Sequence, residues 1–207
     1  IPAWRLTPPR DQKAIEAMEK AYWDSDHSIK AMLEVLFTSD FFKDEAVRYA
    51  KVKNPAEMVV SLIRMTGEFK GYQPGLFEAS QEPKYMGMDL MNPPTVEGWH
   101  TGREWIDSGT LVERINFASS EVGRTNAPGI QRMIERVGTS DDLLEPAEFV
   151  EACLDALGCI DLGDRSKSVL IEHAAQIGSF TSNKPGSAER TVEMFQLIVS
   201  TPDYQYC

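Results

Sequence analysis

The sequence predicts an all-α fold, an irregular helical bundle interrupted by one long structured loop rich in proline, glycine and tryptophan. Apolar residues recur at helical spacing along most of the 207 residues. No run of alternating apolar and polar residues is long enough to predict a strand. Asparagine, serine, proline and glycine stand where such helices would begin and end. From these three observations we expect about nine or ten helices.

Four helices are expected in the first third of the chain. They span about 11–23, 28–37, 39–49 and 54–67. Asp26 or Ser28 can cap the second helix. Asn54 suits the N-cap of the fourth, where Pro55 occupies the first turn and its missing N–H does no harm. Gly67 is expected to end that helix.

Six more helices follow, and most of them are separated by proline or glycine. They span about 74–86, 108–122, 129–137, 146–157, 165–177 and 187–200. We expect Ser108 or Thr110 to cap the helix over 108–122. Because 123–129 has the composition of a linker, a helical core over 1–123 and a C-terminal subdomain over 124–207 are predicted. A single domain over 1–207 is the alternative.

The charge balance disfavours two classes of partner. The chain has 21 basic and 32 acidic residues, which gives a net charge of −11. That charge opposes nucleic acid and anionic membranes, and no cluster of basic residues provides a local exception. No apolar run reaches the ~20 residues that a membrane-spanning helix needs.

The three cysteines are Cys153, Cys159 and Cys207, and their spacing is not that of a metal site. Cys153 and Cys159 could form a local disulfide across Gly158. Buried free thiols are the favoured alternative.

The most informative segment is the loop over 85–107, because its large aromatic and rigid turn residues are costly to order without a purpose. Within it, His100, Glu104 and Asp107 could act as metal ligands or acid–base groups, since on a helix they would share one face. Gly98 and Gly102 argue against a continuous helix there. We therefore favour a structural role for the three side chains and predict no metal site and no cofactor.

Aromatic and basic residues of the same region are the candidate binding residues. Trp99 and Trp105, with Arg103 between them, could anchor a partner or could hold the loop on the helices. Arg114 could form a buried clamp with a carboxylate that holds the loop, or it could lie on a solvated face. His100 completes the candidate binding surface.

Several blocks of the sequence together resemble a known family. LFTSDFF, AKVKNPAEMVVSLIR, MGMDLMNPPTVEGWHTGREWIDSGTLVERINF and LIVSTPDYQ occur in this order. They are similar to the carboxy-terminal half of the bacterial family catalogued as domain of unknown function 1800. The structural motif of that family corresponds here to Lys53, Pro55, Glu57, Met86, Gly87, Pro93, Pro94, Gly98, Trp99 and Trp105. Met88 replaces a common glutamine and His100 a common proline, so chemistry shared by the family at position 100 is in doubt.

The resemblance implies an exported bacterial protein, periplasmic, cell-surface or extracellular, that has a further amino-terminal half. It also implies a partner, an exported protein similar to sulfatases and alkaline phosphatases. It implies no established activity. We therefore expect a non-catalytic helical binding module that docks a protein or an envelope or extracellular polymer. The alternative is a hydrolase or a hydrolase accessory subunit, with or without a metal, built around His100, Glu104 and Asp107.

Overall fold

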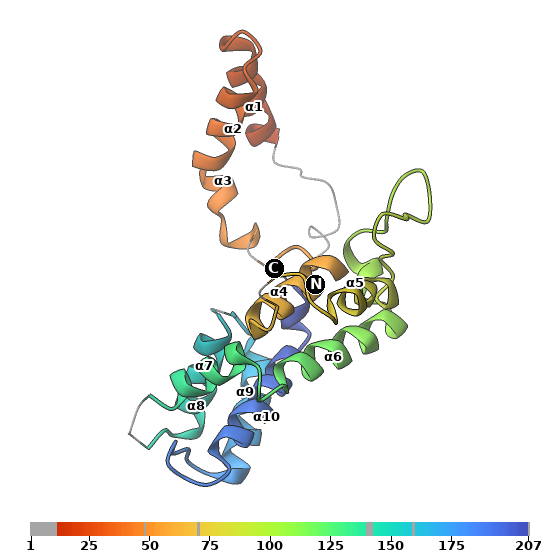
Figure 1. Ribbon diagram of the computed structural model, residues 1–207. Helices are drawn as coiled ribbons and strands as arrows, with labels where there is room; N and C mark the ends of the chain where they lie inside the picture. The colour runs from red at the N-terminus through yellow and green to blue at the C-terminus, as the bar shows by residue number, and fades with distance from the viewer. Residues whose placement is uncertain (1–11, 48, 70, 140–142, 159, 207) are drawn as a thin grey trace. The chain divides into compact units, whose positions relative to one another are not determined.

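The computed structural model describes residues 12–47, 49–69, 71–139, 143–158 and 160–206. These ranges contain ten α-helices and no extended strand, so the predicted all-α class is confirmed. The β pairing in the described ranges consists of isolated bridges, such as Thr95–Gly98. The chain forms two compact units, one ending at Val52 and one covering Lys53–Tyr206 (Figure 1). The boundary predicted near residue 123 stays a prediction.

The first unit is a helical hairpin of α1 (Gln12–Asp24) and α2 (Ile29–Thr38), which pack against each other (Figure 1). The chain reverses where Asp26 and His27 adopt positive φ angles of 56° and 69°. Of the two predicted caps of α2, Ser28 is the one used, since its side chain accepts from the N–H of Ala31.

The helix predicted over 39–49 is broken into two short pieces. They are α3 (Asp40–Lys43) and the 3-10 helix η2 (Glu45–Val47). Asp44, between them, has an extended backbone with ψ of 137°, which ends the first piece. The apolar spacing of this stretch therefore predicted helical turns but not their interruption.

The second unit contains the remaining elements. They are α4 (Pro55–Thr66), α5 (Leu76–Tyr85), η3 (Gly102–Ile106), α6 (Ser108–Val122), α7 (Pro128–Val137), α8 (Pro146–Leu157), α9 (Asp164–Ile177), α10 (Ser187–Val199) and η4 (Asp203–Gln205). Helix α6 packs against α4, α5 and α10, and α10 also contacts α7, α8 and α9 (Figure 1).

The core of this unit draws its side chains from most of these helices. Met58 and Leu62 of α4, Phe149 of α8, and Phe195 and Ile198 of α10 are all completely buried. Each such side chain contributes about 1.5–3 kcal/mol through the removal of apolar surface from water. Because helices on both sides of residue 123 share this core, it fixes α6 and with it one end of the 85–107 loop.

Helices α4 and α7 approach closely at Gly129. A Cβ atom placed on Gly129 would lie 1.8 Å from the carbonyl oxygen of Met65, which no side chain can do without a shift of backbone. Gly67 ends α4 in the left-handed conformation, with φ of 65°, as the sequence predicted. The glycine at 129 therefore sets how near the two helices lie.

Cys153 is buried in α8 as a free thiol, in line with the favoured prediction for that residue. Burial raises the pKa of this thiol well above its usual range. Cys159 and Cys207 lie outside the described residues. Among the described helices, none is both long and apolar enough to cross a bilayer.

Candidate functional site

The 85–107 loop leaves α5 at a buried anchor. Met86 is completely buried, and Gly87 follows with φ of 91°, a conformation that favours glycine. The N–H of Met88 then donates to the carbonyl of Pro83, 2.7 Å away, inside the last turn of α5. The predicted motif residues Met86 and Gly87 thus hold the beginning of the loop on the helix.

Asp89 organises the middle of the loop. Its Oδ2 accepts from Nδ2 of Asn92 at 3.1 Å and lies 3.2 Å from Nζ of Lys84. The hydrogen bond from Asn92 and the ammonium of Lys84 lower the pKa of Asp89. Its carbonyl accepts the indole N–H of Trp99 at 3.0 Å. Trp99, which is half-buried, therefore ties the two sides of the loop together.

The far end of the loop is a tight turn over Thr95–Gly98. The N–H of Gly98 donates to the carbonyl of Thr95 at 3.1 Å, and Gly98 has φ of 104°. The N–H of Glu97 donates to the hydroxyl of Thr95 at 3.2 Å. Pro93 and Pro94, which are both exposed, precede the turn and restrict the backbone that enters it.

Apolar side chains are exposed on this turn and beside it. Val96 and Met91 are almost fully exposed, at 107% and 93%, and Leu90 is 40% exposed. Each of these exposed apolar side chains would gain from burial against another apolar surface. The three residues Leu90, Met91 and Val96 are called the loop tip below.

His100 and Glu104 form a pair, but not on a continuous α-helix. Their Nδ1 and Oε2 atoms lie 3.1 Å apart, and both side chains are exposed. Glu104 Oε2 also accepts the N–H of Thr101 at 3.3 Å, which is part of the capping box of η3. Gly102, with φ of 60°, begins this 3-10 helix, so the glycine did exclude a longer helix.

Asp107 caps α6, the role that the sequence had given to Ser108 or Thr110. Its Oδ1 accepts the N–H groups of Gly109 and Thr110, both at 3.0 Å, and the Thr110 hydroxyl at 3.0 Å. These hydrogen bonds lower the pKa of Asp107, those from Thr110 most of all. Ser108 is instead the first residue of the helix.

Trp105 differs from Trp99 because it is buried, with 5% of its surface exposed. The backbone carbonyl of Trp105 accepts the hydroxyl of Thr110 at 3.1 Å. The residue therefore holds η3 against the unit and offers no exposed indole face. Arg103, on the same 3-10 helix, is exposed.

An open hollow of about 620 Å³ lies between the loop and the helices. Its lining includes Lys84 of α5, Asp89, His100 and Glu104 of the loop region, and Asp107 at the start of α6. The structure therefore brings the three predicted acid–base candidates to the rim of one hollow. No group of three His, Cys, Asp or Glu side chains in the described part of the chain is placed to hold a metal ion.

Arg114 lies in a different place from the loop. It is completely buried, and its Nε donates to Gln205 Oε1 and its Nη2 to the carbonyl of Lys53, both at 2.8 Å. Burial lowers the pKa of Arg114 to about 10, and the nearby carboxylate of Glu57 opposes that shift. The hydrogen bonds of Arg114 thus run to the start of α4 and to η4, and it is not part of the hollow.

The predicted motif residues Lys53, Pro55 and Glu57 form the other half of this buried connection. The N–H of Lys53 donates to the carbonyl of Gln205 at 2.9 Å, and its Nζ donates to the carbonyl of Tyr204 at 2.7 Å. The ammonium also lies 3.9 Å from the centre of the Tyr204 ring. Asn54 and Glu57 cap α4 reciprocally around Pro55.

Sequence analysis missed the role of Tyr204 and Gln205, which anchor this connection. Tyr204 is buried, and burial raises its pKa to about 12. The available signal was the block LIVSTPDYQ, in which a polar and aromatic segment follows an apolar helix. That block indicated a family resemblance, but its contacts with residue 53 depend on the folded chain.

The fold and the site define an all-α protein with an internally bonded loop beside an open hollow. A family model described as "Protein of unknown function (DUF1800)" matches residues 4–206, and the chain belongs to this family. Comparisons with curated proteins and with solved structures gave no match.

Proposed function

We propose that the protein is a non-catalytic helical binding module whose 85–107 loop docks a partner protein. The observation that carries the proposal is that polar side chains of the loop form hydrogen bonds within it, while its apolar side chains are exposed to solvent. Asp89, Asn92, Trp99 and Glu104 bond within the loop, whereas the apolar residues of the loop tip are exposed. A rigid loop with exposed apolar side chains loses little conformational entropy when it binds, which favours docking.

Protein is a better occupant of the loop tip than a polymer of sugars or phosphates. Leu90, Met91 and Val96 are aliphatic and exposed, and aliphatic side chains gain most from burial against another apolar surface. Trp105, the indole that borders the hollow, is buried and cannot stack flat on a sugar ring. We infer that the protein is exported and that its partner is the exported sulfatase- or phosphatase-like protein suggested by the family resemblance.

Co-purification with that partner tests the proposal. The two proteins are expressed together, and Val96→Asp is expected to reduce the recovered complex at least tenfold, because it places a charge in the centre of the contact. Val169→Asp is the matched control, since Val169 is also exposed, at 57%, but lies on α9. Equal recovery with Val96→Asp and wild type would contradict the proposal.

The second candidate is a hydrolase, or an accessory subunit of one, built around His100 and Glu104. The observation in its favour is their 3.1 Å contact at the rim of the hollow, with Asp107 on the same rim. The engagement of Asp107 Oδ1 in three hydrogen bonds of the α6 cap favours a structural role for that residue. Elemental analysis separates the two functions: a stoichiometric divalent metal that is lost in His100→Ala would support the hydrolase.

A further inference from the structure

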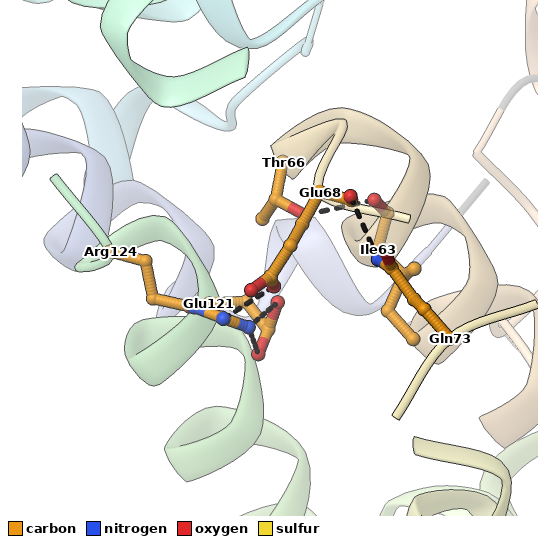
Figure 2. A network of polar contacts seen from close by, with 6 residues as sticks. All are labelled: Ile63, Thr66, Glu68, Gln73, Glu121 and Arg124. Carbon is orange, nitrogen blue, oxygen red and sulfur yellow. Dashed lines mark hydrogen bonds and ion pairs between the residues drawn. The ribbon is translucent and has the colours of Figure 1, made fainter. Parts of the chain in front are cut away.

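Arg124, just beyond the end of α6, lies between two carboxylates (Figure 2). Its Nη1 is 3.2 Å from Oε1 and 3.4 Å from Oε2 of Glu121. Its Nη2 forms an ion pair with Oε2 of Glu68, which follows α4 in the chain. One guanidinium thus joins the end of α6 to the segment after α4.

The two glutamate side chains differ in their access to water. The side chain of Glu121 is 11% exposed and that of Glu68 is 36% exposed, although Oε2 of Glu68, the oxygen that faces Arg124, is itself buried. A buried carboxylate loses much of its hydration, so its charged form needs a full counter-charge. Arg124 divides its single positive charge between Glu68 and Glu121, so it does not provide a full counter-charge for Glu121.

Neighbouring elements add negative charge around Glu121. Burial raises the pKa of Glu82 of α5, and the negative charges of Glu113 and Glu121 on α6 raise it further, so Glu82 lies within electrostatic range of both. Arg132 of α7 approaches Gly67. Its Nη2 would lie 3.3 Å from a Cβ atom placed on that glycine. Helix α10 meets this part of α6 through Gln196, whose Nε2 donates to the carbonyl of Ser119 at 3.1 Å.

We propose that the triad Glu68–Arg124–Glu121 is a proton-sensitive clamp, which takes up one proton from solvent on acidification and then holds the segment after α4 more tightly. The proton binds the carboxylate of Glu121, which stays hydrogen-bonded to Arg124 as a neutral group. Arg124 is then left with one anion, Glu68, and the ion pair between them strengthens.

The direction of the pKa of Glu121 agrees with this sequence of events. Burial raises the pKa of Glu121, the positive charge of Arg124 opposes this shift, and the negative charge of Glu68 increases it. A carboxyl whose pKa is higher in the folded than in the unfolded chain stabilises the fold below its ordinary value of 4.5. That stabilisation is lost as the pH rises through the folded-state pKa, so the clamp is tight in acid and loose at neutral pH.

The clamp acts on the chain that leads into α5. Besides its ion pair with Arg124, Glu68 accepts a hydrogen bond at its backbone carbonyl from Nε2 of Gln73, 3.0 Å away (Figure 2). A looser Glu68 therefore weakens the attachment of Gln73, three positions before α5 begins. The inference concerns this attachment alone and does not depend on docking by the loop tip.

Hydrogen exchange of the whole chain tests the clamp at pH 7.5 and at pH 4.5, the ordinary pKa of a glutamate, where a carboxyl whose pKa is raised is mostly protonated. After correction for the intrinsic rate at each pH, amides of 67–69 and 71–73 in wild type are expected to exchange about three- to tenfold more slowly at pH 4.5. Glu121→Gln mimics the protonated state and should show slow exchange at both values. Glu68→Gln removes the ion pair and should show fast exchange at both.

Asp155→Asn is the matched control, because Asp155 also pairs with an arginine, Arg136, but both side chains are 60% exposed. This variant should keep the pH dependence of wild type. The clamp is overturned if wild type shows no dependence at 67–69 and 71–73, or if Glu121→Gln retains it. The clamp would also be overturned if Asp155→Asn lost the pH dependence of exchange at 67–69 and 71–73, since a general charge effect would then explain the result.

Discussion

Nη2 of Arg114 donates to the backbone carbonyl of Lys53 at 2.8 Å, across 61 positions of the sequence. The same guanidinium reaches Gln205, 91 positions further on. One buried side chain of α6 therefore fixes the start of α4 and the 3-10 helix η4 together. Arg114, a candidate binding residue in the sequence, therefore serves this connection and not the loop.

We expect Arg114→Lys to lower the free energy of unfolding by about 2–4 kcal/mol, because an ammonium cannot reach both oxygens and leaves one buried acceptor unpaired. Chemical denaturation monitored by circular dichroism measures the change. Arg136→Lys is the control, since that ion pair is exposed and such pairs contribute at most about 1 kcal/mol. Equal losses in the two variants would show that Arg114 has no special role.

Gly129→Ala is expected to destabilise the protein by about 1–3 kcal/mol, because its methyl group would overlap the carbonyl oxygen of Met65 and push α7 away from α4. Thermal unfolding gives the readout. Gly109→Ala is the matched control in α6, where the nearest atom to a new Cβ, Asp107 Oδ1, is 3.7 Å away. It should be neutral or stabilising by up to about 1 kcal/mol, since alanine favours helix. A Gly129→Ala protein as stable as wild type would mean that the two helices lie further apart.

Asp107→Asn is expected to lower the melting temperature at neutral pH. Asparagine still caps the helix but lacks the charge that the N-terminus of α6 favours. Because the folded-state pKa of Asp107 is lowered, its extra stabilisation is present above its ordinary value of 3.8 and disappears as the pH falls through the lowered value. Melting curves from pH 7 to pH 2.5 should therefore show the two proteins converging in acid. A constant difference throughout would rule out the charge as its cause.

Cys153 is expected to resist thiol reagents in the folded protein, because it is buried and its thiolate is disfavoured. In a Cys159→Ser/Cys207→Ser variant, the remaining thiol should react with a disulfide reagent only after denaturant is added. Rapid reaction of the native variant would show that α8 opens readily. Absorbance of the released thiolate measures both rates.

Local signals predicted those parts of the fold that neighbours in sequence determine. Asn54, Pro55 and Gly67 bracket α4 because a cap, a first-turn proline and a left-handed glycine act within one or two turns of helix. The cap of α6 was predicted at Ser108 or Thr110, one or three residues too late, since Asp107, Ser108 and Thr110 are all good capping residues. Only the folded backbone shows which of them faces the free N–H groups.

The candidate site was predicted less completely because it depends on contacts distant in sequence. The spacing of His100 and Glu104 suggested a shared face only on a continuous helix, and the structure pairs them without such a helix. Trp99 and Trp105 looked equivalent in the sequence, but one bonds across the loop and the other is buried. Arg114 could not be assigned, because its partners lie in segments that only the tertiary fold brings together.

The 2.9 Å hydrogen bond between the N–H of Lys53 and the carbonyl of Gln205 joins the first and the next-to-last residue of the larger unit. Neighbouring termini allow a protein to be circularly permuted. A short peptide could bridge residues 53 and 206, and new ends could be opened at the Thr95–Gly98 turn. The same closeness would let the unit be inserted whole into a surface loop of another protein.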